Sequence, residues 1–270
     1  VLGKAQGETF WGVDEDAHSV ARFIRRWLTE NRRWASPKYL IGESYGGIRS
    51  ALLLRDLQNG EGSVAINGAM LISPAFDIQF IDIGTSNLHQ ALLLPTLTAI
   101  ALYHKALPEM PKDEAAFLQQ AREFAAGEYQ AALFAGTSMR QERLDAIVAQ
   151  LHRFTGLDAE WLRRSNLRID AARFRRELLR SRGLVVGRLD ARYTGTEEDD
   201  VGEVPSGDPM MPAIGGAYTA MFEDYLAREL TVKMDRSYEV MSGRANAMWK
   251  RSAETSHAFA GWLDVMPALI

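Results

Sequence analysis

The 270-residue sequence contains no cysteine. This absence excludes disulfide bridges, zinc sites built on thiolates and cysteine nucleophiles. It leaves the cellular compartment open, because many exported bacterial proteins also lack cysteine.

The sequence also lacks a long hydrophobic run and an excess of positive charge. Its longest apolar stretch, at 91–103, has the sequence ALLLPTLTAIALY. This is shorter than the roughly 20 residues of a membrane-spanning helix, so we expect a buried helix and no membrane span. The net charge is −4, and nothing global indicates nucleic acid or an anionic membrane as a partner. The arginines between 138 and 192 are spread over predicted helix faces without an aromatic platform, which favours a solvated surface over a nucleic-acid site.

The first 75 residues alternate between helical and strand patterns. Apolar residues at helical spacing predict a helix over 14–33, and short apolar runs predict strands over 38–41 and 65–73. A glycine-rich turn at 42–47 and a second helix over 48–57 lie between the strands. This alternation is typical of a parallel sheet, so we predict the α/β fold class.

The middle of the chain is almost continuously helical in pattern, from 112 to 182. Asp158 and Asp170 are predicted N-caps of helices, and Gly156 and Gly183 are predicted C-terminal caps. No strand alternates with these helices, so we expect a separate helical subdomain.

After this region we predict a short strand over 184–189, an acidic loop over 194–212 and a helix over 214–230. We therefore expect a partial α/β core at 1–95, a helical cap insertion at 96–213 and a segment returning to the core at 214–270.

The turn has the sequence IGESYGG, in which Gly42, Ser44 and Gly46 match the pattern G-x-S-x-G. Between a strand and a helix this pattern indicates a nucleophile elbow, in which flanking glycines let neighbouring backbone approach closely. Ser44 would then lie at the N-terminus of the second helix, and the N–H of Tyr45 would help to stabilise an oxyanion. The pattern fixes only three residues, so a serine in an ordinary glycine-rich turn is the alternative.

The longer string GESYGG at 42–47 resembles the elbow G-E-S-Y-G/A-G of the serine carboxypeptidases, a peptidase family of α/β-hydrolases. The aromatic and acidic helix before it is also similar to bacterial members of this family, as is the strand INGAMLISP after it. A later segment at 212–242 resembles the part that returns from the helical insertion to the core. The resemblance therefore covers about residues 10–242, and the elbow hexapeptide is its specific part.

The resemblance implies a role for each elbow residue. Ser44 aligns with the acylating serine, Tyr45 with the residue that supplies an oxyanion-hole N–H, and Gly46 belongs to the substrate-binding turn. Glu43 aligns with a glutamate that helps to hold the terminal carboxylate of a peptide. Two carboxyl groups bind each other only by sharing a proton, so such an enzyme should work best in acid. Without the resemblance, Glu43 would be interpreted as a surface acid.

A serine nucleophile also needs a general base and a group that orients it. The histidines are His18, His89, His104, His152 and His257. Only His257, with Asp235 upstream, fits the order Ser, Asp, His of the α/β-hydrolases. Its surroundings have a helical pattern and lack the expected end of a strand.

The resemblance instead implies that the catalytic Asp and His lie beyond residue 270 and that the second oxyanion donor lies before Val1. We therefore interpret the chain as the middle of a longer enzyme, inactive by itself.

The expected activity is release of C-terminal residues from peptides that have a free carboxylate, through an acyl-enzyme. No metal ion or organic cofactor is required for it. An esterase or acyltransferase of the same fold, and a non-catalytic homologue or binding module, remain alternatives. The resemblance suggests export, and the sequence indicates neither residue preference nor oligomeric state.

Overall fold

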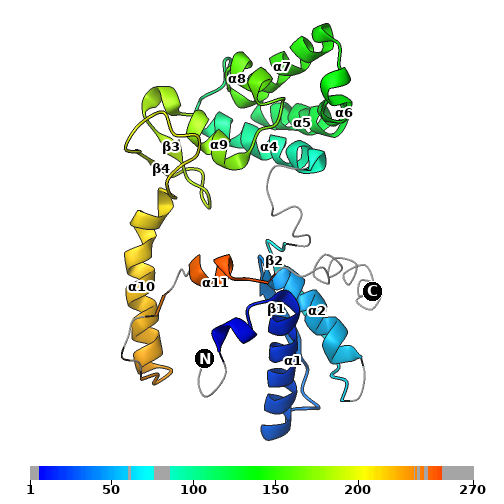
Figure 1. Cartoon of the computed structure of the whole chain (residues 1–270), viewed down its shortest axis with the longest axis vertical. Helices are drawn as coiled ribbons and strands as arrows, with labels where there is room; N and C mark the ends of the chain where they lie inside the picture. Colours follow the sequence, from blue (N-terminus) through cyan, green and yellow to red (C-terminus); the bar gives the residue numbers. More distant parts are fainter. Residues whose placement is uncertain are drawn as a thin grey trace. The chain divides into compact units, whose positions relative to one another are not determined.

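The computed structural model describes residues 6–59, 62–75, 86–233, 235, 238–239 and 243–250. The chain divides into two compact units (Figure 1). Unit 1 comprises Val1–Asp82 and Glu239–Ile270, and unit 2 comprises Ile83–Tyr238. The apolar helix after residue 86 thus belongs to the helical unit, whereas the boundary predicted from the sequence is at 95/96.

Unit 1 has a helix, a strand, a helix and a strand in succession, as predicted. Strands β1 and β2 form a parallel pair, in which Tyr39 lies opposite Gly68 and Glu43 opposite Ile72. A short 3-10 helix precedes these elements and a short helix follows them in the chain. The elements of unit 1 are η1 (Gly7–Thr9), α1 (Val13–Glu30), β1 (Tyr39–Glu43), α2 (Gly46–Gln58), β2 (Gly68–Ile72) and α11 (Gly243–Ala247).

Helix α1 forms because its apolar side chains recur on one face, where Ala17, Ala21 and Leu28 are buried. Three acidic residues occupy its first turn, where they favour the helix dipole. The predicted helix over 14–33 is too long at its C-terminal end, because α1 ends at Glu30. Arg32 has a left-handed φ of 54°, which a helix cannot continue.

The two faces of the parallel pair differ in their cover. On one face, Leu40 packs against a buried cluster that α1 and α2 form together. The other face carries the side chains of Tyr39, Ile41, Met70 and Ile72, each at least 50% exposed. Parallel sheets are normally covered on both faces. This pair therefore has the hydrophobic composition of a sheet interior on a face where the side chains of the described residues remain exposed.

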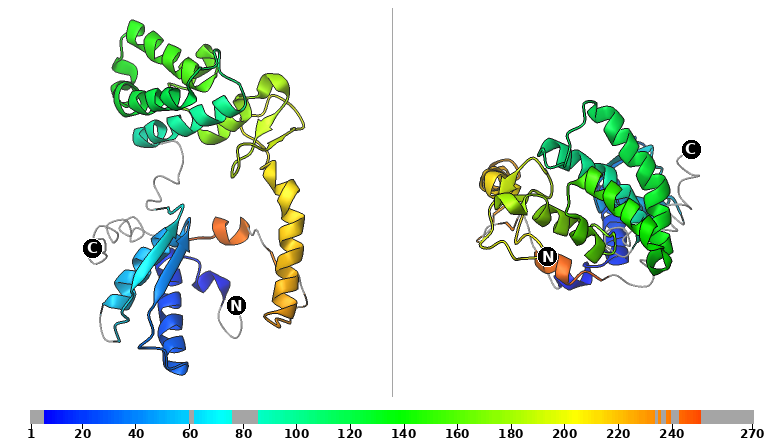
Figure 2. Two further views of the ribbon diagram at one scale, coloured as in Figure 1. Left: turned by 180° about the vertical axis from the view of Figure 1, so that it is seen from behind. Right: turned by 90° about the horizontal axis from the view of Figure 1, so that it is seen from above.

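Unit 2 is a helical bundle followed by a small antiparallel pair and a long helix (Figure 2). The expected helices between 112 and 182 are confirmed. The elements are α4 (Asn87–Tyr103), α5 (Glu114–Phe124), the π-helical turn η2 (Ala125–Tyr129), α6 (Gln130–Ala135), η3 (Gly136–Ser138), α7 (Gln141–Thr155), α8 (Ala159–Arg164), α9 (Ala171–Glu177), η4 (Arg180–Arg182), β3 (Val185–Val186), β4 (Thr194–Gly195) and α10 (Met210–Arg228).

The predicted caps of these helices are confirmed. The carboxylate of Asp158 accepts from two backbone N–H groups at the start of α8, and Asp170 does the same at the start of α9. Gly156 and Gly183 end α7 and η4 with φ of 71° and 65°. These left-handed values explain why glycine occupies both positions.

The core of unit 2 joins α4 to the helices that follow it. Leu94, Leu97 and Ala101 of α4 are buried in a cluster with residues of α5, α6 and α7. Pro95 lies inside α4 without ending it. Among the described residues, no helix combines the length and apolar character needed to cross a bilayer.

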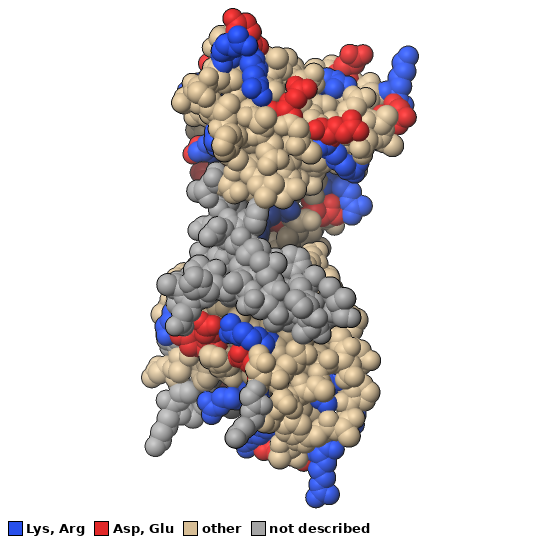
Figure 3. All heavy atoms as spheres, turned by 90° about the vertical axis from the view of Figure 1, so that its right-hand side faces the viewer, with Lys and Arg blue, Asp and Glu red and all other residues tan. Residues whose placement is uncertain are grey.

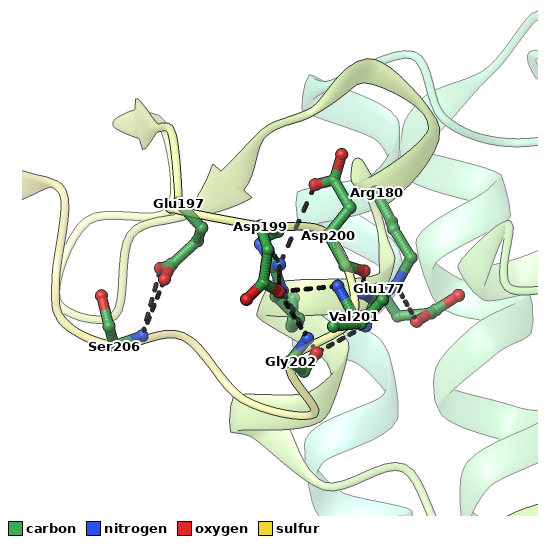
Figure 4. Close-up of polar contacts among 9 residues, drawn as sticks. Glu177, Arg180, Glu197, Asp199, Asp200, Val201, Gly202 and Ser206 are labelled. Atoms are coloured by element: carbon green, nitrogen blue, oxygen red, sulfur yellow. Dashed lines mark hydrogen bonds and ion pairs between the residues drawn. The ribbon is translucent and has the colours of Figure 1, made fainter.

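The acidic loop before α10 is held by arginines of α9 and η4 (Figure 4). Arg176, only 1% exposed, donates to the backbone carbonyls of Asp199 and Gly202. Arg180 donates to the carbonyls of Asp200 and Gly202 and to the carboxylate of Glu177. Arg176 and Arg180 thus stabilise unit 2 by holding this loop through hydrogen bonds.

The face of the molecule in Figure 3 shows the wider charge pattern. Basic and acidic side chains are mixed over it. Such mixing gives no extended field of one sign among the described residues on that face.

The described residues are therefore mostly helical, with one small sheet in each unit. The alternation in unit 1 is compatible with the predicted α/β class. Its sheet has two strands in the described part of the chain, so the larger sheet of a hydrolase is not seen there.

Candidate active site

Ser44 occupies the sharp turn between β1 and α2, and its backbone is strained. Its φ is 54°, a left-handed value that is uncommon for a residue other than glycine. Three hydrogen bonds hold this conformation. Ser44 N–H donates to the Ile72 carbonyl (3.0 Å), and the Ser44 carbonyl accepts from Gly47 N–H (2.9 Å) and Ala75 N–H (2.8 Å). The end of β2 and the residues after it thus hold the turn through hydrogen bonds to the Ser44 backbone.

The glycines beside Ser44 differ in how crowded they are. A Cβ on Gly42 would overlap the carbonyl oxygen of Gly46 and lie 2.6 Å from Ser50 Oγ. A Cβ on Gly47 would lie 2.8 Å from Pro74 Cβ. A Cβ on Gly46 would meet no atom of the described residues within 4 Å. The predicted need for glycine is therefore confirmed at position 42 and wrong at position 46, since the second crowded glycine is Gly47.

The Ser44 side chain is exposed, and no described residue hydrogen-bonds to its hydroxyl. The backbone N–H groups of Tyr45 and Gly46 have no acceptor in the described part of the chain either. They begin the 13-residue helix α2, whose dipole favours negative charge at this end. The turn thus presents a hydroxyl beside free N–H groups, as acyl transfer requires.

Glu43 is the last residue of β1 and directly precedes Ser44. Its side chain is exposed, and none of the described residues forms an ion pair or hydrogen bond with its carboxylate. The carboxylate is therefore available to a ligand at the same end of the strand as Ser44.

The side chain of Tyr45 contacts residues from the N-terminal and the C-terminal segments of unit 1. Its hydroxyl lies 3.5 Å from Asp16 Oδ2, and its ring makes an edge-on contact with Trp249 at 5.4 Å between centroids. Arg49 donates to both oxygens of Asp16, at 2.6 and 3.1 Å. Burial raises the pKa of Tyr45 above its ordinary value, and the Asp16 carboxylate raises it further. The phenol therefore stays protonated, and it donates a hydrogen bond to Asp16.

No pattern in the sequence predicted this network between Asp16 and Arg49. The two residues are 33 positions apart, so no local pattern connects them. Only the packing of α1 against α2 brings them together.

We expect Asp16 and Arg49 to be coupled in stability. Asp16→Asn and Arg49→Met, alone and together, should give a coupling energy of about 1 kcal/mol or more, because the Asp16 side chain is only 14% exposed. Chemical denaturation of the four proteins measures this energy. The matched control is the exposed pair Arg26 and Glu30 of α1, whose coupling should be smaller. Equal coupling in the two pairs would contradict the assignment.

In the described part of unit 1, no histidine forms a hydrogen bond with Ser44. His18 is exposed on α1, and His89 lies in the first turn of α4. Three histidines have other partners at 2.6–3.3 Å: His18 with Asp56, His104 with the Ala191 carbonyl and His152 with the Leu157 carbonyl. Asp235 is exposed, and its predicted partner His257 lies outside the described residues.

The described residues thus combine a strained, exposed serine with N–H donors and a free carboxylate. Within the same residues, no cluster of three or more His, Asp or Glu side chains has the arrangement of a metal site. Comparison of the chain with protein-family models, curated proteins and solved structures gives no match.

Proposed function

We propose that this chain carries the nucleophile of a serine-type carboxypeptidase with an α/β-hydrolase fold. One observation carries the proposal: Ser44 has a left-handed φ at a turn from strand to helix, within the sequence GESYGG. A strained, exposed serine at this point is what a nucleophile elbow requires. The open apolar face of the β1–β2 pair supports a larger sheet around it.

The proposed reaction proceeds in two steps. Ser44 Oγ attacks the carbonyl carbon of the last peptide bond, and the Tyr45 N–H stabilises the oxyanion that forms. The general base takes the Ser44 hydroxyl proton during the attack and gives it to the leaving nitrogen as the C–N bond breaks, which releases the C-terminal amino acid. Water hydrolyses the acyl-enzyme and releases the shortened peptide. The base and the residue that orients it are assigned to parts of the protein outside the described residues.

Glu43 gives the proposed enzyme its preference for a free C-terminus. Its exposed carboxylate precedes Ser44, so a peptide carboxylate one residue beyond the attacked bond would lie near it. The two carboxyl groups attract each other only while they share one proton. Cleavage should therefore be fastest in acid and should decline as the pH rises and the shared proton is lost.

Glu43→Gln should separate peptide recognition from ester hydrolysis. The substrates are a blocked dipeptide with a free carboxylate, its C-terminal amide and a simple ester, assayed at acid pH with the protein in its full natural length. We expect the dipeptide to be cleaved and the amide to be resistant. Glu43→Gln should lower kcat/KM for the dipeptide about tenfold or more and ester hydrolysis much less, since only the dipeptide loses a charge-assisted contact.

Two outcomes would redirect the proposal. Equal losses for dipeptide and ester would remove carboxylate recognition from Glu43. Cleavage of the ester alone by the unaltered protein would make it an esterase of the same fold.

A further inference from the structure

Unit 2 contains a pocket that the proposed reaction does not use. It has a volume of about 470 Å³, and residues of α6, η3, α7, α8 and the segment after α8 line it. Figure 1 labels these α-helices. This volume is in the range of roughly 300–1,000 Å³ that is usual for small-molecule sites. Its walls combine apolar side chains with two arginines: Leu133, Met139, Leu144, Leu167, Arg163 and Arg168.

The charge at this pocket has one sign. None of the residues that line it is acidic. Arg163 is paired with Asp145, a carboxylate that is 47% exposed. Arg168 is half-buried, and its acceptors among the described residues are neutral oxygens, at 2.9 Å to Asn87 Oδ1 and at 3.0 Å to the Asn166 carbonyl. A guanidinium has five N–H donors, so Arg168 keeps donors and an unbalanced charge.

The charge of Arg168 also affects Tyr129, a buried residue in the core of unit 2. Burial raises the pKa of Tyr129, and the charge of Arg168 opposes that rise. The Tyr129 hydroxyl donates to the Leu167 carbonyl at 2.6 Å. Tyr129 thus fixes the segment that carries Arg168.

The backbone around the pocket is held in unusual conformations. Asn166 and Leu167 are consecutive residues with φ of 52° and 64°, and Gly136 has a φ of 55°. Left-handed values cost free energy in residues other than glycine, and they persist only where the surroundings impose them. Leu167 is 4% exposed and donates its N–H to the Leu162 carbonyl. The strained segment therefore places Leu167 in the wall and Arg168 beside it.

We propose that this pocket binds a carboxylate that carries an apolar tail. The carboxylate would pair with Arg168, because a guanidinium recognises it through charge-assisted hydrogen bonds. The tail would pack against Met139 and Leu144, which are partly exposed, and remove their apolar surface from water, with the buried side chains of Leu133 and Leu167 beside them. A fatty acid and an apolar residue at the C-terminus of a peptide share this chemistry. The site is independent of Ser44, and its occupation does not depend on the proposed peptidase activity.

Calorimetric titration of the complete chain tests this proposal. The ligands are decanoate, N-acetyl-leucyl-leucine and decylamine, which has the same tail as decanoate with the opposite charge. We expect at least one carboxylate to bind at least tenfold more tightly than decylamine, and to bind more weakly as NaCl is added. Binding of decanoate alone would identify a fatty-acid site, and binding of the dipeptide would identify a site for peptide C-termini.

Substitutions identify the residues responsible. Arg168→Gln should weaken carboxylate binding about tenfold or more, and Arg168→Lys should restore most of it. Leu144→Gln should weaken it by removing apolar contact. The matched control is Arg164→Gln on α8, since Arg164 lines a different pocket.

Thermal unfolding shows which variants keep the fold, and the salt dependence of the unaltered chain tests the charge without any variant. Absence of carboxylate binding, equal binding of decylamine, or unchanged binding by folded Arg168→Gln would overturn the proposal.

Discussion

Ser44→Ala is expected to lower the release of the C-terminal residue from a blocked dipeptide by about 10,000-fold or more. Removal of a serine nucleophile leaves only the small rate enhancement that binding and the oxyanion donors provide. The measurement is kcat/KM at acid pH for the protein in its full natural length. Equal activity of the two proteins would refute the assignment of Ser44 as nucleophile.

Two further variants separate lost chemistry from lost structure. Ser44→Gly should also be inactive but more stable by about 1 kcal/mol, because glycine adopts the φ of 54° at position 44 without strain. Ser63→Ala should be fully active, since Ser63 is exposed and lies in the loop before β2. A destabilised Ser44→Gly variant would contradict the strain that we assign to the elbow.

Local sequence patterns predicted the elements of both units well. The caps at Asp158 and Asp170 followed from residue type and spacing, because each carboxylate satisfies N–H groups only two or three residues away. The end of the first helix was predicted at residue 33 instead of Glu30, and this error also has a local cause. Arg32 adopts a left-handed conformation, and arginine carries no signal for it.

Contacts between elements that are distant in the chain could not be predicted from local sequence patterns. The pattern G-x-S-x-G made Gly46 the second required glycine, but the loop after β2 approaches the elbow at Gly47. The support of Tyr45 by Asp16 and Trp249 depends on segments from both ends of the chain. The predicted helix over 214–230 corresponds to α10, where Tyr218, Met221, Phe222 and Tyr225 recur at helical spacing, yet α10 buries none of its described residues. Periodicity identifies such a face, and only packing shows whether it is covered.

Gly42→Ala is expected to have the largest effect on stability, lowering the free energy of unfolding of unit 1 by about 3 kcal/mol or more. The added methyl would overlap the carbonyl oxygen of Gly46 and approach Ser50 Oγ. A backbone carbonyl in the first turn of α2 cannot rotate away as a side chain can, so relief requires movement of the strand or the helix. Gly46→Ala is the matched control, and it should be neutral or stabilising because alanine favours the helix.

Hydrogen exchange, read separately for peptides of the two units, measures this prediction. In Gly42→Ala, exchange should accelerate in β1, α2 and β2, which share the elbow and its hydrogen bonds. The core of α4, α5 and α7 should exchange as before, because it belongs to the other compact unit. If Gly42→Ala were as stable as Gly46→Ala, the close approach of β1 and α2 at the elbow would be wrong. Ser44 would then lose the strained conformation on which its assignment as nucleophile rests.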